Sequence, residues 1–292
     1  MSDDLDPLAP GGPTTIDLPV PDRALVIVAH PDDAEFQAGA TLAKWARAGC
    51  EVHHLVLTDG SKGTWDPTVD PAELVAERHR EQHAAAHALT GSADAGRVHF
   101  LDLIDGELVC DVTNRGLVAR VIRQVRPTVV IGHDPWKRYR LHPDHRAAGK
   151  LCVDGIVAAR DPGFHPELLR DGLDPHRPEV LLLFEPDVAN HAELATDADH
   201  VTRLTALEAF ASQIATTHLY KVDSIVRADG KVPADGDGDT GTGTGEIDPM
   251  AAWRNRERAR LAGPGAWAGA TLAEPFRLIV DRQQMVDQAY NG

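Results

Sequence analysis

The stretch Ala29-His30-Pro31-Asp32-Asp33-Ala34-Glu35 decides how the rest of the chain is interpreted. It follows a short apolar run, residues 24–28, which the pattern predicts to be a buried strand. One imidazole and three carboxylates therefore stand at the end of a strand, where open α/β sheets build their sites. Because the proline biases the residue before it towards an extended backbone, His30 and Asp33 can converge on one point while Asp32 points elsewhere.

A second cluster, His142-Pro143-Asp144-His145, lies far along the chain in a similar setting. It follows an apolar run at residues 128–131 and precedes a helix predicted over residues 145–159. A single His-Pro-Asp unit has a simpler explanation as a helix cap, with Asp144 accepting backbone N–H bonds. Two such units, each placed after a predicted parallel strand, indicate a shared site instead.

The chain alternates predicted strands with predicted helices, which is typical of a parallel α/β sheet with right-handed crossovers. We expect a flexible tail over residues 1–21, one domain over 22–292, and a mobile loop in the Gly-, Asp- and Thr-rich tract at about 227–247. The strands are predicted at 23–29, 52–58, 98–101, 128–131, 180–184 and 276–280, and the helices at 37–48, 71–89, 114–125, 145–159 and 201–213.

The composition narrows the class of protein. The 292 residues are 42% hydrophobic, enough for one large α/β domain or two small ones. A net charge of −16 argues against general affinity for nucleic acid or anionic membrane. The three cysteines, Cys50, Cys110 and Cys152, are widely spaced and indicate neither a disulfide framework nor a thiolate zinc site. No signal-peptide pattern or membrane-length apolar run is present, so we expect a cytoplasmic protein without a membrane partner. The composition makes no prediction of oligomeric state.

The two clusters together have the composition of a catalytic metal site. Histidine and carboxylate ligands suit zinc and neighbouring divalent metals, and a catalytic site needs three protein ligands and an open position. We expect His30, Asp33 and His145 to be these ligands. Asp32 is then free to act as general base on a water whose pKa the metal lowers. His142 would stabilise a developing oxyanion, and Asp144 is expected to orient one of the neighbouring histidines.

The chain resembles the family of PIG-L or LmbE-like zinc-dependent N-acetylglucosaminyl deacetylases. These include the glycosylphosphatidylinositol-precursor enzyme and deacetylases of the mycothiol and bacillithiol pathways. The resemblance covers about residues 23–190. It is carried by His30-Pro31-Asp32-Asp33, Thr58-Asp59-Gly60, Arg78-x-x-Glu81, Asp105-Gly106 and His142-Pro143-Asp144-His145.

The resemblance implies a Rossmann-like, three-layer α/β/α fold with a mostly parallel sheet flanked by helices. It also implies zinc on His30, Asp33 and His145, with Asp32 as base and His142 as oxyanion stabiliser or acid. Two further residues, Arg78 and Asp105, would hold hydroxyls of a small amino-sugar substrate. For Arg78 the alternative is a solvated i,i+3 pair with Glu81.

The sequence departs from the family pattern at two places. Ala34 intervenes between the aspartate pair and Glu35, and Arg140 stands where some members have a tyrosine, with Tyr139 one position earlier. We therefore assign no role to Glu35, Tyr139 or Arg140.

The expected function is removal of an acetyl group from an N-acetylglucosaminyl substrate or conjugate. One alternative is an amidase that cleaves a larger acyl group from a glycoconjugate, as mycothiol-conjugate amidases do. Another is a non-catalytic protein that binds metal or sugar, although such a protein needs no base beside the metal. Iron(II) is an alternative to zinc on the same ligands. The His79, His83 and His87 series at i, i+4 and i+8 is interpreted as a polar helix face.

Overall fold

The computed structural model describes residues 7–8, 10–92, 94, 97–214 and 248–280. Its centre is an eight-stranded sheet with the strand order β1-β7-β8-β6-β5-β2-β3-β4. The strands are β1 (Thr15–Ile16), β2 (Arg23–Val28), β3 (Glu51–Thr58), β4 (Val98–Leu103), β5 (Val129–His133), β6 (Val180–Phe184), β7 (His191–Ala195) and β8 (Leu272–Val280). The helices are α1 (Asp33–Arg47), α2 (Pro71–Thr90), α3 (Val112–Val125), α4 (Pro143–Arg160), α5 (Pro166–Arg170), α6 (Asp197–Glu208), α7 (Ala211–Gln213) and α9 (Pro249–Trp267).

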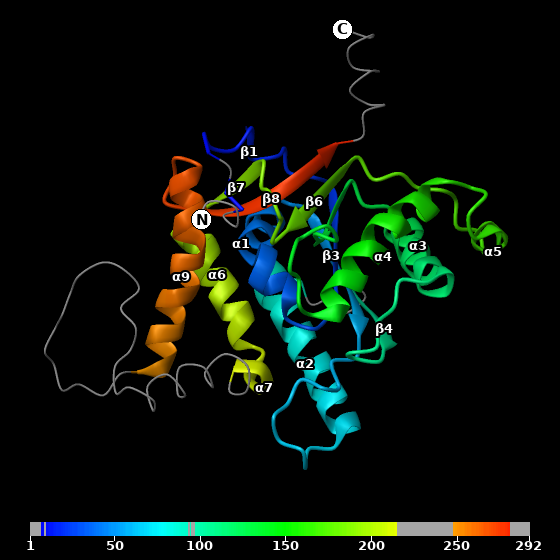
Figure 1. Ribbon diagram of the computed structural model, residues 1–292, viewed down its shortest axis with the longest axis horizontal. Helices are drawn as coiled ribbons and strands as arrows, with labels where there is room; N and C mark the ends of the chain where they lie inside the picture. Colours follow the sequence, from blue (N-terminus) through cyan, green and yellow to red (C-terminus); the bar gives the residue numbers. More distant parts are fainter. Residues whose placement is uncertain (1–6, 9, 93, 95–96, 215–247, 281–292) are drawn as a thin grey trace, which may run out of the picture.

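The strand β2 is apolar throughout its buried length because helices cover both faces of the sheet. Leu25 and Ile27 belong to one core cluster, which they share with residues of α3 and α4. Val26 and Val28 belong to the cluster on the opposite face, together with residues of α1 and α2. Figure 1 shows these two helical layers on either side of the sheet. Successive side chains of a strand point to opposite faces, so a strand covered on both sides has no polar face.

The strand order creates a crevice at the carboxyl edge of the sheet. β2 pairs in parallel with β3 on one side and with β5 on the other. The chain therefore proceeds outward in opposite directions from β2 and β5, and the loops that follow these two strands diverge. Such a switch point is where open α/β sheets bind ligands. Because β2 and β5 are neighbours, the strands that precede the two His-Pro-Asp clusters bring the clusters to the same edge of the sheet.

The sheet is mostly parallel, as predicted, with one antiparallel strand. β8 pairs antiparallel with both β6 and β7. The Rossmann-like α/β fold expected from the sequence is therefore confirmed, although β7, α5 and α9 were not predicted. Among the described residues, no helix is long and apolar enough to cross a membrane.

Part of the tail expected to be flexible over residues 1–21 pairs with the sheet. Thr15 and Ile16 pair in parallel with β7, and the Asp17 carboxylate lies 2.8 Å from the Lys44 ammonium. The segment satisfies backbone groups along the edge of β7 that would otherwise be exposed. The tract at about 227–247, expected to be a mobile loop, lies outside the described residues.

Gly149 allows α4 to approach β5 and so helps to place the second cluster. A Cβ atom at Gly149 would lie 2.8 Å from the His133 carbonyl oxygen and 2.9 Å from the Pro135 nitrogen. We expect Gly149→Ala to lower the free energy of unfolding by about 1–3 kcal/mol, because backbone atoms must move. Denaturant unfolding measures the effect. The matched control is Gly163→Ala, where nothing lies within 4 Å of the added atom. Equal effects in both variants would contradict this account.

Candidate active site

The first cluster forms the turn between β2 and α1. Asp32 has a φ of 104°, in the left-handed region that few residues other than glycine adopt. The Arg78 guanidinium stabilises this turn, donating to the Pro31 carbonyl oxygen at 2.6 Å and to the Gly60 carbonyl oxygen at 3.1 Å. Because the backbone reverses direction here, His30 and Asp33 can face the same point, as the sequence predicts.

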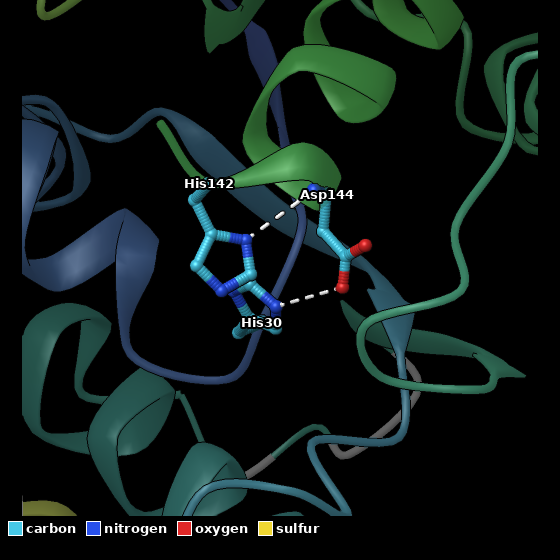
Figure 2. Close-up of side chains that lie close together, drawn as sticks. All are labelled: His30, His142 and Asp144. Carbon is cyan, nitrogen blue, oxygen red and sulfur yellow. Dashed lines mark hydrogen bonds and ion pairs between the residues drawn. The ribbon is translucent and has the colours of Figure 1, made fainter. Parts of the chain in front are cut away.

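The second cluster begins α4 and meets the first one across the crevice. His142 is the N-cap of this helix, and its Nδ1 accepts a hydrogen bond from the Asp144 backbone N–H at 3.3 Å. Figure 2 shows the His142 ring beside the His30 ring, with the Asp144 carboxylate turned towards His30. The His30 Nε2 lies 3.2 Å from Asp144 Oδ2. The two His-Pro-Asp units therefore form one site.

Three side chains present nitrogen or oxygen atoms to a single point. His30 Nδ1 lies 3.2 Å from His145 Nε2. His145 Nε2 lies 3.3 Å from Asp33 Oδ1, and His30 Nδ1 lies 3.5 Å from Asp33 Oδ2. Ligand atoms about 2.0–2.1 Å from a tetrahedral zinc ion are separated by about 3.3 Å. The three side chains that the sequence predicts to be ligands therefore lie close enough together to fit a divalent metal.

Two overlapping groups of side chains are also close enough to hold an ion, but their carboxylates are already engaged. In the group of His30, His142 and Asp144, the Asp144 oxygens accept the backbone N–H groups of Gly106 and Leu108 at 2.6 and 3.2 Å. In the group of His133, His145 and Glu185, the Glu185 carboxylate pairs with Arg140. Asp33 Oδ2 also accepts the His30 backbone N–H at 2.9 Å, but Asp33 Oδ1 faces His145 Nε2, itself a candidate ligand, at 3.3 Å. The set of His30, Asp33 and His145 is therefore the candidate whose carboxylate keeps an oxygen directed at another ligand.

The electrostatic environment favours an ionised Asp33. Burial raises the pKa of Asp33, but His145 and His133 lower it more, so that it lies well below its usual value. Burial lowers the pKa of His30, but hydrogen bonds to Asp105, Asp144 and Asp33 raise it well above its ordinary value. The site thus concentrates negative charge around its imidazoles, which is the environment that a bound cation requires.

The Asp32 carboxylate does not cap helix α1, which is the structural role that its position would otherwise suggest. Asp32 is the N-cap of α1, yet its side chain makes no capping hydrogen bond. Its Oδ2 lies 3.3 Å from the Arg78 guanidinium. Burial raises the pKa of Asp32 to about 7, although Arg78 opposes the shift. A carboxylate with this pKa can accept and release a proton near neutral pH.

His133 was not predicted from the sequence to belong to the site. It is the last residue of β5, which is a position similar to that of His30 after β2. Its Nε2 lies 3.3 Å from Asp33 Oδ2, and its ring stacks on the His145 ring at 4.4 Å between centroids. Burial lowers the pKa of His133 to about 4, so the ring is neutral, and its Nε2 accepts the Ala29 backbone N–H at 3.4 Å. The available signal was its position, directly after a predicted strand whose loop leads to the second cluster.

Arg78 and Asp105, predicted to hold sugar hydroxyls, both line the cavity at the site. The alternative of a solvated pair between Arg78 and Glu81 is wrong. Both side chains are buried, and Glu81 instead accepts hydrogen bonds from the Ser212 backbone and hydroxyl groups. Asp105 contacts His30 Nε2 at 3.3 Å. Burial raises the Asp105 pKa, but the hydrogen bond from His30 outweighs it and the pKa falls to about 2.

The three residues left without a role take different positions. Glu35 is fully buried and accepts a hydrogen bond from Gln82 Nε2 at 2.9 Å, while Gln82 Oε1 accepts one from the Asp32 backbone at 3.2 Å. Glu35 therefore stabilises the turn at Asp32 indirectly, through Gln82. Arg140 pairs with Glu185, and Tyr139 is 79% exposed.

The site opens into a cavity of about 710 Å³, within the range of small-molecule sites. Its walls come from the loops after β2, β3, β4, β5 and β6 and from residues of α1, α2, α4, α7 and α9. The residues that line it are His30, Asp32, Asp33, Phe36, Gln37, Lys62, Gly63, Arg78, Asp105, Gly106, His142, Pro143, His145, Glu185, Gln213 and Arg260. All of the predicted site residues except Asp144 contribute to this wall.

Comparison with known proteins agrees with this geometry. Residues 25–156 match the model of the family described as GlcNAc-PI de-N-acetylase, PIG-L. The diacetylchitobiose deacetylase of Thermococcus kodakarensis is 36% identical over 191 residues, which cover 65% of this chain and 70% of that protein. The chain belongs to the PIG-L family. The resemblance found in the sequence is therefore confirmed.

Other PIG-L relatives extend the comparison. A 1D-myo-inositol 2-acetamido-2-deoxy-alpha-D-glucopyranoside deacetylase of Streptomyces avermitilis is 33% identical over 171 residues, 51% of this chain and 58% of that protein. Among solved structures, the N,N'-diacetylchitobiose deacetylase of Pyrococcus horikoshii has a TM-score of 0.71 and 26% identity, covering 89% of this chain and 84% of that one. The similarity thus includes nearly the whole fold.

Asp144 is expected to act on metal binding through His30. Its Oδ2 faces His30 Nε2, which directs the Nδ1 of the same ring to the ligand cluster. We expect Asp144→Asn to weaken metal affinity by about 10–100-fold, the usual effect of losing a carboxylate that orients a ligand histidine. Competition with a chelator measures the affinity. Asp154→Asn, on the exposed side of α4, is the control. Unchanged affinity in Asp144→Asn would refute the role.

Proposed function

We propose that this protein is a metal-dependent deacetylase that hydrolyses the acetamido group of an N-acetylglucosamine unit in a small glycoside and releases acetate. The observation that carries the proposal is the cluster of His30, Asp33 and His145 atoms, 3.2–3.5 Å apart, beside an Asp32 carboxylate that caps no helix. The names of the PIG-L relatives support amide hydrolysis on N-acetylglucosaminyl groups.

His30, Asp33 and His145 would hold the cation. A divalent metal bound there would polarise the acetamido carbonyl group and lower the pKa of a nearby water molecule. Asp32 would accept the proton of the attacking water, and its pKa of about 7 suits this transfer near neutral pH. It would then be able to return the proton to the departing amine.

His142 would donate a hydrogen bond to the carbonyl oxygen as negative charge develops on it. Because its Nδ1 accepts the Asp144 N–H, the neutral ring carries its proton on Nε2. Burial lowers the pKa of His142, and the neighbouring His30 and His145 lower it further, which favours this neutral form. The role of oxyanion stabiliser inferred from the sequence therefore has a defined donor atom.

Zinc is the metal we propose, because two imidazoles and one carboxylate form a common catalytic zinc set. Iron(II) accepts the same ligands, so the two metals must be compared directly. The protein would be freed of metal, reloaded with one equivalent of zinc or iron(II), and assayed for acetate release. The higher turnover at equal metal content identifies the better cofactor.

A substrate screen tests the proposed function itself. Metal-loaded protein is incubated with N-acetylglucosamine, N,N'-diacetylchitobiose and N-acetylglucosaminyl-inositol, and acetate is quantified. Release of acetate from at least one of them is expected. Parallel substrates with a longer acyl chain on the same nitrogen test the amidase alternative, which predicts faster release of the longer acid. Metal binding and sugar binding without release of any acid would identify a non-catalytic protein.

A further inference from the structure

Two buried side chains of opposite charge contact the middle of α1, the helix whose first turn carries Asp33. Arg203 belongs to α6 and Glu274 to β8, and both are buried. Figure 1 shows α6 beside α1. The Arg203 Nε lies 3.8 Å from Glu274 Oε1. Neither side chain lines the active-site cavity, and the proposed hydrolysis gives neither of them a role.

Arg203 and Glu274 bind the two backbone groups that form one rung of the α1 hydrogen-bond ladder. In a regular α-helix the N–H group of Ala40 donates to the carbonyl oxygen of Phe36, four residues earlier. Here the Ala40 N–H donates to Glu274 Oε1 at 2.9 Å, and the Arg203 Nη2 donates to the Phe36 carbonyl oxygen at 2.9 Å. Side chains inserted into this ladder are a recognised cause of helix bending, so the rung is a junction between two parts of α1.

The two charges match the ends of two consecutive helical segments. Arg203 also donates from Nε to the Glu35 carbonyl oxygen at 3.1 Å. Glu274 Oε2 accepts the Thr41 N–H at 2.8 Å and the Thr41 hydroxyl at 2.6 Å. Cations stabilise the carbonyl end of a helix, and anions stabilise its amide end. The first turn of α1 therefore ends on the cation, and the rest of α1 begins on the anion.

Gly39 makes room for this arrangement. A Cβ atom at Gly39 would lie 2.8 Å from Arg203 Cγ and 3.3 Å from its Cδ. The same guanidinium also donates to Glu257 of α9 at 2.8 Å. Buried charges are stable only when they are paired. The three charged side chains therefore hold α6, α9 and β8 against one point of α1.

The segment before this junction carries groups that the active site uses. Asp33 is the proposed carboxylate ligand of the metal. The Glu35 carboxylate accepts a hydrogen bond from Gln82, which in turn accepts the Asp32 backbone N–H. Arg203 binds the carbonyl oxygen of Glu35 itself, two residues after Asp33. A displacement at the junction would therefore move the metal ligand and the base together.

We propose that Arg203 and Glu274 are positioning residues for the deacetylation: by binding both sides of the junction in α1, they hold the turn with Asp32 and Asp33 in its catalytic position. The inference rests on the proposed function for the role of Asp32. Its effect on Asp33 can be measured without turnover, as the affinity of the site for a divalent metal. Because neither positioning residue lines the cavity, the expected loss is in kcat rather than in KM.

Three substitutions disturb the junction in different ways. Glu274→Gln keeps the size of the side chain but offers one acceptor oxygen where Ala40 and Thr41 engage two. Arg203→Lys keeps the charge but offers one nitrogen for contacts that two now make. Gly39→Ala adds a methyl group against Arg203. In each variant we expect kcat for acetate release to fall by about tenfold or more, with KM within about twofold, because small misplacements of catalytic groups can cost about 100-fold. Metal affinity, measured by competition with a chelator, should fall by about tenfold.

Two matched substitutions leave the junction intact. Glu257→Gln neutralises a buried carboxylate whose hydrogen bond is to Arg203 and not to the backbone of α1. Gly263→Ala adds a methyl group to α9, where nothing lies within 4 Å of it. Both controls should keep kcat and metal affinity within about twofold of the wild type. The proposal is overturned when folded Glu274→Gln and Gly39→Ala match the wild type in both quantities. It is also overturned when Glu257→Gln loses as much as they do, because that result indicates a general structural effect.

Metal affinity separates failure of this inference from failure of the proposed function, because its measurement requires no turnover. Circular dichroism first shows which variants are folded, and Gly39→Ala, which removes no charge, decides the matter if Glu274→Gln does not fold. If the wild type deacetylates no glycoside but the junction variants weaken metal affinity and Glu257→Gln does not, the proposed function fails while the positioning of Asp33 stands. If the wild type is active and every folded variant matches it, only the inference fails.

Discussion

Asp33→Asn is expected to lose the metal and the activity together. Asp33 is the carboxylate on which the ligand cluster converges, because its oxygens lie 3.3–3.5 Å from nitrogens of His30, His133 and His145. Asparagine removes the negative charge that offsets a divalent cation. A metal supplies several kcal/mol of transition-state stabilisation, so turnover should fall by roughly 10³-fold or more. Elemental analysis of the purified variant and acetate release measure the two losses.

The control for this experiment must remove one carboxylate without touching the site. Asp171→Asn serves, because Asp171 pairs with Arg120 on the surface. It should keep full metal content and activity. If Asp33→Asn kept its metal and lost only turnover, Asp33 would have to be moved from the ligand set to the catalytic base. If it kept both, the cluster of His30, Asp33 and His145 would not be the metal site.

The central strands of the fold could be predicted because the sequence of each one, taken alone, indicates a buried strand. β2, β5 and β6 are buried on both faces, so each appears as a nearly continuous apolar run. The ligands could be predicted for a related reason. Each His-Pro-Asp unit lies in the segment after a parallel strand, and parallel strands bring their carboxyl ends to one edge of a sheet.

The elements missed by sequence reasoning lack such a local signal. β7 contains His191 and Glu193, which are buried and hydrogen-bonded to each other at 2.9 Å, so the strand has no apolar pattern. α9 contains Pro264 and buries Glu257, whose partner Arg203 is 54 residues away in the sequence. Buried charges of this kind are stable only when paired, and a single segment does not reveal its distant partner.

Because contacts between distant segments are not visible in the sequence, only some of the active-site residues could be predicted. Arg78 stabilises the turn at Pro31 and Asp32, 47 residues earlier in the chain, through a contact that no local pattern encodes. From the sequence, Arg78 could only be assigned by resemblance. His133 was missed because a lone histidine beside a strand is more often a core residue than part of a site. Its proximity to Asp33 depends on the pairing of β2 with β5.

Asp32→Asn is expected to separate catalysis from metal binding. Asparagine has the size of aspartate and tolerates a positive φ, so the turn with φ 104° should be preserved. Its backbone N–H still donates to Gln82, and Arg78 still donates to the carbonyl oxygens of Pro31 and Gly60. The variant should therefore fold and retain its metal. The amide group cannot accept the proton of the attacking water.

General-base catalysis commonly contributes about 10²–10⁴ in rate, or about 3–5 kcal/mol of barrier. We expect kcat for acetate release by Asp32→Asn to fall by this factor, with little change in KM or metal content. Full activity in the metal-loaded variant would remove Asp32 from the mechanism. Metal loss equal to that of Asp33→Asn would make it a ligand. The lack of a capping hydrogen bond from Asp32 already argues against a helix cap, a role that asparagine would fill as well as aspartate. A large loss of rate with the metal retained is the outcome that only a base predicts.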